Sequence, residues 1–128
     1  MSLRSFEDLD CWKAGRDLRI FVARVIVPSL PIAERFRLSD QLLRSARSIT
    51  ANLAEGFGRY HFADNSKFCR NALGSCCETM DHLITARDEG MLSLEHFAEG
   101  RTKATAAHGM ISGYIAYLQR AARQKGGT

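Results

Sequence analysis

Both prolines of this 128-residue chain lie in one short stretch, residues 28–31, which reads Pro-Ser-Leu-Pro. Because proline ends helices, this stretch is the clearest break in the sequence. Before it, apolar residues recur at alternating steps of three and four, the spacing of a helix that packs along a bundle seam. Gly56, Gly58 and Gly90 mark two further helix ends, since glycine readily supplies the left-handed cap. We therefore expect four helices, over about residues 8–27, 34–57, 64–89 and 93–123.

Each expected helix carries an apolar stripe, and no part of the chain shows a strand-like alternation. The first stripe is Cys11, Ala14, Leu18, Phe21 and Val25. The second is Leu42, Ala46, Ile49 and Leu53, flanked by Phe36. The fourth is Leu94, Phe97, Arg101, Ala104, His108, Ile111, Ile115 and Leu118. Four amphipathic helices with short connections predict an all-α protein, an antiparallel up-down-up-down left-handed four-helix bundle that forms a single domain over residues 1–128.

The composition is that of an ordinary globular protein, with 45% hydrophobic and 25% charged residues. No apolar run approaches the roughly 18 residues that a membrane span needs, and the first residues lack an apolar signal segment, so we expect a cytoplasmic protein. The four cysteines contain no Cys-x-x-Cys pair and have no histidine at zinc-finger spacing. We therefore expect buried free thiols, with neither a metal nor a cofactor.

The formal net charge of +4 is unevenly distributed along the chain. Residues 61–100 carry three basic and seven acidic groups, whereas residues 101–128 carry five basic groups and no acidic one. Fourteen of the eighteen basic residues are arginine, whose planar guanidinium suits phosphate. This pattern fits a polyanionic partner, and it equally fits a surface that serves solubility and salt bridges to the acidic segment. The candidate phosphate contacts are Arg44, Arg47, Arg101, Lys103, Arg120, Arg123 and Lys125.

A second stripe on the expected second helix consists of Gln41, Ser45, Ser48, Asn52 and Glu55, about a quarter-turn from the apolar stripe. An exposed helix face usually carries longer charged side chains, whereas short ones let another backbone approach closely. One hypothesis is therefore a subunit interface. The alternative is that these groups bond to carbonyls of their own helix or face water. A partly buried Glu55 needs a partner, for which Arg16, Arg44 or an arginine of a neighbouring subunit are the candidates.

Catalytic constellations are scarce in this sequence. The Gly74-Ser75-Cys76 segment lacks the second glycine and the preceding strand of a nucleophile elbow, so close helix packing explains it better. Glu78 and Asp81 share a helix face but lack the converging histidines of a bundle metal site. We expect them to form a partly buried ion pair with Arg101, and we expect His108 to be a core histidine. The chain is therefore not expected to be an enzyme.

Three motifs resemble one protein family. The pattern Q-x-x-R-x-A-x-S-I-x-x-N-L-A-E-G over residues 41–56 resembles the signature helix of the bacterial four-helix-bundle proteins encoded in 23S rRNA intervening sequences. F-x-D-L-x-x-W-x-A over residues 6–14 and A-x-G-S-x-x-E over residues 72–78 resemble the first and third helices of that family. Leu53 stands where isoleucine is usual, the Cys76-Cys77 pair is unusual, and the fourth helix is similar only in pattern and length.

The resemblance implies an antiparallel four-helix bundle that assembles as a homopentamer, with no active site. It also implies a relationship to the accessory variability proteins of diversity-generating retroelements, which are basic and associate with nucleic acid and with a reverse transcriptase. The expected function is thus a non-enzymatic, oligomeric RNA- or DNA-binding protein. Since the sequence suggests no aromatic platform for stacking bases, we expect little sequence specificity. The alternative function is a protein-interaction scaffold without a nucleic-acid role.

Overall fold

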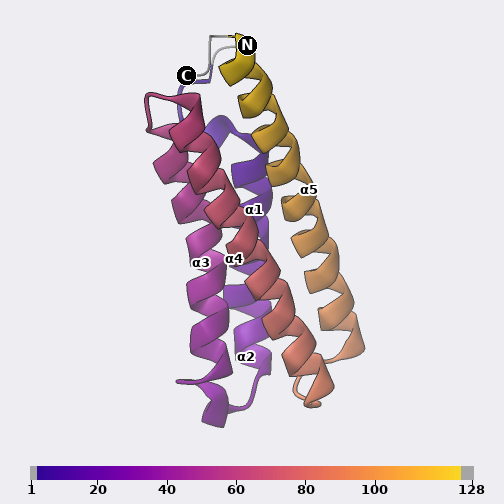
Figure 1. The fold of residues 1–128 in the computed structure, drawn as a ribbon. Coiled ribbons are helices and arrows are strands. Elements are labelled where there is room, and N and C mark those ends of the chain that lie inside the picture. Colours follow the sequence, from indigo (N-terminus) through magenta and orange to yellow (C-terminus); the bar gives the residue numbers. More distant parts are fainter. Residues whose placement is uncertain (1–2, 125–128) are drawn as a thin grey trace.

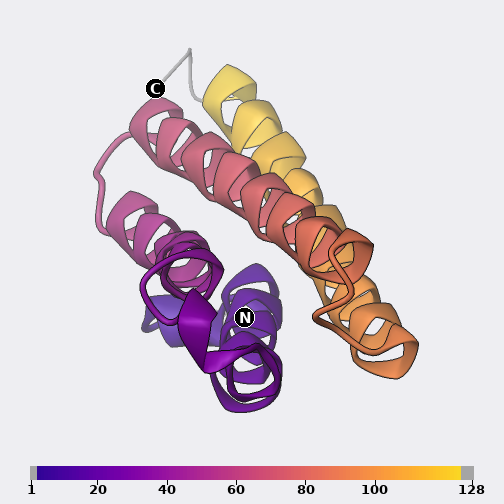
Figure 2. The ribbon, with the colours of Figure 1, turned by 90° about the horizontal axis from the view of Figure 1, so that it is seen from below.

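The computed structural model describes residues 3–124 and shows four antiparallel helical rods (Figures 1 and 2). The first rod has three parts, α1 (Asp10–Phe21), a π turn (Val22–Ile26) and α2 (Val27–Ser29). The others are α3 (Leu38–Phe57), α4 (Phe62–Asp88) and α5 (Leu94–Gln124). Because α1 and α4 each pack against both α3 and α5, the α1–α4 and α3–α5 pairs lie on the diagonals of the bundle. The predicted all-α four-helix bundle is confirmed.

The first rod changes its geometry just before Pro28. Proline has no N–H to donate to the carbonyl four residues earlier, and its ring crowds that carbonyl. The π turn at Val22–Ile26 widens the helix at this point. As a result Ile26 is fully buried, whereas Val25, which the heptad pattern assigns to the core, is only partly buried.

The α3 helix begins at Leu38, later than the expected start at residue 34. A 3-10 turn at Ile32–Glu34 follows Pro31, and the chain turns once more before the helix starts. The Glu34 carboxylate accepts a hydrogen bond from the Leu38 amide at 3.3 Å, which satisfies one of the free donors in the first turn. Phe36, predicted to flank the core, lies in this connection and is 84% exposed.

The buried stripe of α5 differs from the predicted one at three positions. Leu94, Arg101 and His108 are exposed, so their assignment to the core was wrong. Gly100 and Ala107 are buried instead. Arg101 and His108 are seven residues apart, as are Gly100 and Ala107, so both pairs fit a heptad. The second pair is buried because burying an unpaired guanidinium is costly, whereas small residues let neighbouring helices approach. A Cβ added at Gly100 would lie only 3.1 Å from a leucine methyl group of α4.

Three of the four cysteines are buried free thiols. This confirms the prediction for Cys11, Cys69 and Cys76, whereas Cys77 is exposed. Burial raises the pKa of Cys11 and of Cys76 from 9.0 to about 11, and that of Cys69 from 9.0 to about 12. The three thiols therefore stay protonated at neutral pH and pack as small apolar groups.

The buried apolar residues of the long helices lie on their inward stripes. The longest helix, α5, has 31 residues, and its outer face carries mainly polar and small side chains, with Leu94, Met110 and Tyr117 exposed among them. Across residues 3–124, no helix combines the length and the apolar character that crossing a membrane requires.

Candidate nucleic-acid interface

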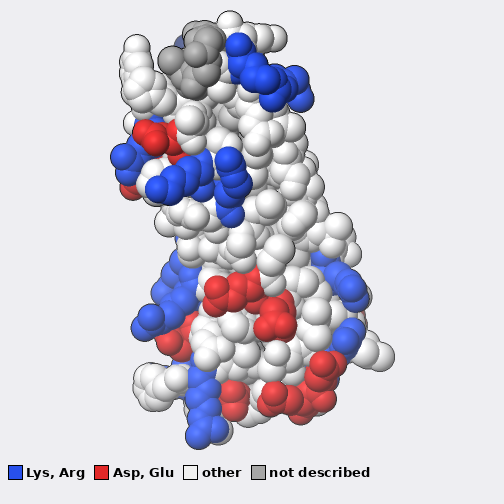
Figure 3. All heavy atoms as spheres, in the orientation of Figure 1, with Lys and Arg blue, Asp and Glu red and all other residues white. Residues whose placement is uncertain are grey.

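One end of the bundle gathers basic and aromatic side chains (the upper end in Figure 1). Here α3 ends, a short connection leads into α4, and α5 finishes. On the face seen in Figure 3, acidic side chains gather mostly towards the opposite end. We call this surface the basic end, and all of its defining residues are exposed: Arg59, Tyr60, His61, Lys67, Arg70, Tyr117, Arg120 and Arg123.

Two hollows between α4 and α5 meet at Phe62, the first residue of α4. Arg70 and Arg123 line the first hollow, which has a volume of about 390 Å³. Tyr117 and Arg120 line the second, which has a volume of about 310 Å³. Three arginines from two helices are thereby grouped around one aromatic side chain.

The arginines of the basic end differ in their partners. Arg59 forms an ion pair with Glu55 at 2.9 Å. Arg70 donates from Nη1 to a serine hydroxyl one turn earlier on α4, at 2.8 Å. Within the part of the chain that the structure describes, no carboxylate oxygen lies within 4.0 Å of a nitrogen of Arg70, Arg120 or Arg123. These three guanidinium groups are therefore available to an external anion.

Acidic groups border the basic end. Asp64 lies in the first turn of α4. Asp8 and Asp10 line a third hollow, of about 520 Å³, which also reaches Tyr117. Because these carboxylates repel phosphate, an anion should favour the side of Tyr117 on which Arg120 lies.

Two of the predicted phosphate contacts lie near the other end of α5. Arg101 is about 28 Å from Arg120 along the helix axis, at about 1.5 Å per residue. The Lys103 ammonium lies 2.9 Å from the Asp17 carboxylate and 3.9 Å from that of Glu99. The charge of Lys103 is therefore already balanced within the chain.

The predicted ion pair between Arg101 and the acidic residues of α4 was wrong. Arg101 is exposed, and its guanidinium lies 5.7 Å from the centroid of the Phe97 ring on its own helix. Glu78 instead approaches His82, at 3.2 Å. The reason is the rotation of the α5 stripe, which turns Arg101 to the outside.

The predicted contacts on α3 are also separate from the basic end. Arg44 forms an ion pair with Asp40 at 3.0 Å. Arg47 borders a hollow lined by residues of α1 and α3. Lys125 lies outside the described residues. Of the six predicted contacts that the structure describes, only Arg120 and Arg123 lie at the basic end.

The polar stripe of α3 meets α4 within the same chain. The Thr79 hydroxyl donates to the Ser45 hydroxyl at 2.8 Å, and the Ser75 hydroxyl donates to that of Ser48, also at 2.8 Å. Asn52 donates from Nδ2 to the carbonyl of Ser48 at 2.9 Å, the own-helix bonding that the alternative interpretation described. Hydrogen bonds inside one chain thus account for the middle of the stripe.

The remaining members of the stripe are open to a second molecule. Gln41 and Glu55 are exposed, and Asn52 is partly exposed. The partner of Glu55 is Arg59 rather than any of the three candidates suggested from the sequence. A subunit interface along the exposed part of the stripe stays a prediction.

Sequence reasoning missed most of the basic end. The sequence feature that could have indicated this surface is the Arg-Tyr-His-Phe segment over residues 59–62, in which basic and aromatic side chains alternate at a helix break. Two aromatic side chains that the sequence analysis did not consider are exposed there, Tyr60 at 92% and Tyr117 at 53%. Arg70 could not be recognised from its spacing, because its neighbours in the fold come from α5.

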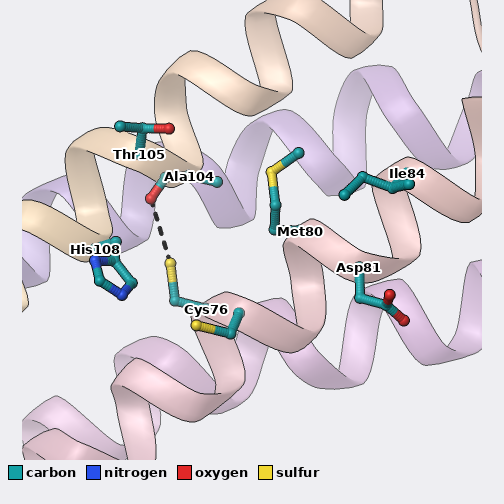
Figure 4. A pocket seen from close by; sticks show the side chains of 8 residues that line it. Cys76, Met80, Asp81, Ile84, Ala104, Thr105 and His108 are labelled. Atoms are coloured by element: carbon teal, nitrogen blue, oxygen red, sulfur yellow. Dashed lines mark hydrogen bonds between the residues drawn. The ribbon is translucent and has the colours of Figure 1, made fainter.

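A further hollow of about 340 Å³ lies between α4 and α5, near the middle of the bundle (Figure 4). Met80 and Ile84 make its wall apolar, and His108 lies at its edge. The Cys76 thiol donates to the carbonyl of Ala104 at 3.4 Å. Nowhere in residues 3–124 do three His, Cys, Asp or Glu side chains gather in a way that could hold a metal ion.

Comparison with known proteins gives a family and a solved structure. The family model described as 23S rRNA-intervening sequence protein matches residues 7–113. A crystal structure of a protein of unknown function from the S23 ribosomal protein family of Bacteroides thetaiotaomicron superposes with a TM-score of 0.76 at 21% sequence identity. The match covers 82% of this chain and 97% of that one, and it supports the fold alone. No curated protein matches the chain.

Proposed function

The chain belongs to the 23S rRNA-intervening sequence protein family, and we propose that it is a non-enzymatic, oligomeric protein that binds nucleic acid through phosphate contacts. The observation that carries this proposal is the group of three arginines, Arg70, Arg120 and Arg123, around the two hollows at the basic end. Their charge is not balanced by a carboxylate among the described residues. Binding of this kind depends little on base sequence.

The proposal predicts how strongly the affinity for nucleic acid depends on salt concentration. Each phosphate that a basic side chain neutralises releases counterions, so the logarithm of affinity falls with the logarithm of salt concentration by about 0.7 to 0.9 per contact. A guanidinium presents a fork of donors that matches phosphate oxygens. Three such groups per subunit, repeated in an oligomer, support binding at moderate salt.

The test is a fluorescence-anisotropy titration of the protein with labelled RNA and DNA, single-stranded and duplex, over a salt series. We compare the wild type with a triple variant, Arg70→Ala, Arg120→Ala and Arg123→Ala. The triple variant should bind more weakly to every probe, and its salt slope should be smaller by about 2 to 3.

A matched control replaces arginines outside the basic end. The triple variant Arg44→Ala, Arg47→Ala and Arg101→Ala loses the same three positive charges, but its arginines lie on α3 and near the start of α5. It should bind with nearly the wild-type salt slope. Equal losses in the two variants would point to a general charge effect, and the absence of wild-type binding even at low salt would remove the proposal.

Self-association is part of the proposal, with the subunit count of five resting on the family resemblance. The exposed part of the polar stripe, Gln41, Asn52 and Glu55, is the proposed contact surface on α3. Gly74 on the neighbouring α4 supports it, because a Cβ there would meet no atom within 4 Å. A second backbone can approach closely at such a surface.

We also propose a protein partner, in addition to nucleic acid. A relationship to the accessory variability proteins of diversity-generating retroelements would make a reverse transcriptase the protein partner.

The second candidate function, a protein-interaction scaffold, is favoured by a different observation: Ile32 and Phe36 are each 84% exposed in the connection before α3. This candidate predicts a loss of protein binding in Phe36→Ser and no affinity for nucleic acid.

A further inference from the structure

The basic end contains more than unpaired cations, because two tyrosine rings are exposed beside them. Tyr60 lies in the connection between α3 and α4, two residues before Phe62, and 92% of its surface is exposed. The Tyr60 and His61 rings meet edge to face, with centroids 4.9 Å apart and planes at 88°. Because the Tyr60 ring is exposed, it contributes little to the stability of the fold, and its face is accessible to a planar ligand.

The second ring, Tyr117, is held in a defined orientation. It stacks on Tyr114, with ring centroids 6.1 Å apart and planes 12° from parallel. Tyr114 is itself fixed, since its hydroxyl accepts a hydrogen bond from Asn65 Nδ2 at 3.1 Å. Tyr117 is nevertheless 53% exposed, so a fixed aromatic ring is presented to the outside.

The two rings and the arginines occur on one surface. Tyr117 and Arg120 line one of the two hollows that meet at Phe62, and Arg70 and Arg123 line the other. The Cα of Tyr60 is at most about 7.6 Å from that of Phe62, two steps of about 3.8 Å along the chain. Aromatic and cationic side chains thus lie at the same end of the bundle, as an unpaired strand presents both bases and phosphates.

We propose that the basic end binds single-stranded nucleic acid, with bases stacking on Tyr60 and Tyr117 and phosphates on Arg70, Arg120 and Arg123. This inference rests on the proposed nucleic-acid-binding function and specifies its substrate class. A duplex keeps its bases stacked and paired inside, so it can use the arginines but not the tyrosine rings. Stacking of this kind tolerates every base, which agrees with the low sequence specificity that the proposed function predicts. The carboxylates of Asp8 and Asp10 direct the phosphates to the α5–α4 side of Tyr117.

The experiment measures the affinity of the full-length protein for a labelled oligouridylate single strand and for a blunt-ended RNA duplex of two complementary strands with the same total number of nucleotides, at one salt concentration. The wild type should bind the single strand more tightly. In Tyr60→Ala and in Tyr117→Ala, affinity for the single strand should fall about tenfold for each stacked base, and affinity for the duplex should stay unchanged. The variants Tyr60→Phe and Tyr117→Phe keep the ring face and should retain wild-type affinity.

The outcomes separate this inference from the function on which it rests. If both alanine variants bind the single strand like the wild type while the triple variant of the basic end loses binding, stacking is refuted and phosphate binding stands. A wild-type preference for the duplex also refutes the inference. If the wild type binds neither probe at low salt, both proposals fail. Circular dichroism checks that each variant is folded, which is expected because both side chains are exposed.

Discussion

The hydroxyl groups of Thr79 and Ser45 lie 2.8 Å apart in the buried contact between α4 and α3. Both side chains are almost fully buried, at 0% and 4% exposure. Thr79 is also within 2.9 Å of the Ser75 carbonyl, and Ser45 donates to the carbonyl of Leu42 at 3.2 Å. A polar contact therefore joins these two helices at a position where most bundles place two apolar residues.

This contact predicts a specific loss of stability. Thr79→Val keeps the shape of the side chain but removes its hydroxyl, so the free energy of unfolding should fall by about 1 kcal/mol. Chemical denaturation measures the change. In a double-mutant cycle with Ser45→Ala, the two changes should be non-additive, because each removes the same hydrogen bond. Strict additivity would show that the two hydroxyls do not stabilise one another.

Replacing glycine by alanine should have opposite effects on stability at Gly109 and at Gly56. Gly109→Ala on the outer face of α5 should raise the free energy of unfolding by about 1 kcal/mol, because alanine favours helix and the new Cβ meets no atom within 4 Å. Gly56→Ala should lower it by about 1 to 3 kcal/mol, since its Cβ would lie 2.6 Å from Asn65 Oδ1 and 3.0 Å from the Asn65 carbonyl oxygen. Thermal unfolding of the two variants and the wild type measures both changes in stability. If Gly56→Ala were stabilised as much as Gly109→Ala, the close approach of α3 and α4 at Gly56 would be contradicted.

The buried thiols predict a loss of stability at alkaline pH. In the unfolded chain a thiol loses its proton near pH 9.0, whereas Cys11 and Cys76 retain theirs to a pKa of about 11 and Cys69 to a pKa of about 12. The folded state therefore binds more protons above pH 9. Stability is fully present below that pH and falls as the pH rises through about 11, by about 1.4 kcal/mol per pH unit for each thiol.

Urea titrations at about pH 8 and about pH 10 measure this slope. Cys69→Ala removes one titrating group, so the variant should lose less stability than the wild type between the two pH values. Cys77→Ala is the control for replacing a cysteine by alanine at an exposed position of the same helix. An unchanged slope in Cys69→Ala would contradict the role of burial in raising its pKa.

The proposed subunit interface predicts the mass of a variant. Gly74→Arg places a long charged side chain on the exposed face of α4, next in sequence to Ser75, which contacts the polar stripe of α3. It should leave helicity unchanged and reduce the mass in solution towards the 14.3 kDa of one chain, as measured by light scattering. Thr102→Arg, on an exposed face of α5, should keep the wild-type mass. Wild-type mass in Gly74→Arg would remove the support for this surface.

The heptad spacing was sufficient to predict the fold, because apolar residues at steps of three and four must share one face of each helix. It was insufficient for the α5 stripe, where Gly100 and Ala107 carry too little apolar character to stand out from Arg101 and His108. The rotation of one helix by one position then changes which charges face outwards.

The candidate site was less accessible to sequence reasoning for a different reason. The three arginines that carry the proposal, Arg70, Arg120 and Arg123, come from α4 and α5, and their availability depends on where carboxylates lie in three dimensions. Lys103 and Arg44 have acidic partners in the fold, whereas Arg120 and Arg123 have none among residues 3–124. Charge counted along the chain does not contain this information.

The π turn before Pro28 gives the first rod one residue more than a regular helix would need to cover the same length. Deleting one residue within Val22–Ile26 would restore a continuous α-helix of the same length, so the residues after it would keep their phase relative to the core. Leu30 would stay buried, and the connection to α3 would start in the same direction. A one-residue deletion in the regular part of the rod would instead rotate everything after it by about 100°. The π turn is therefore the place where homologous chains can differ in length by one residue without changing the residues that follow.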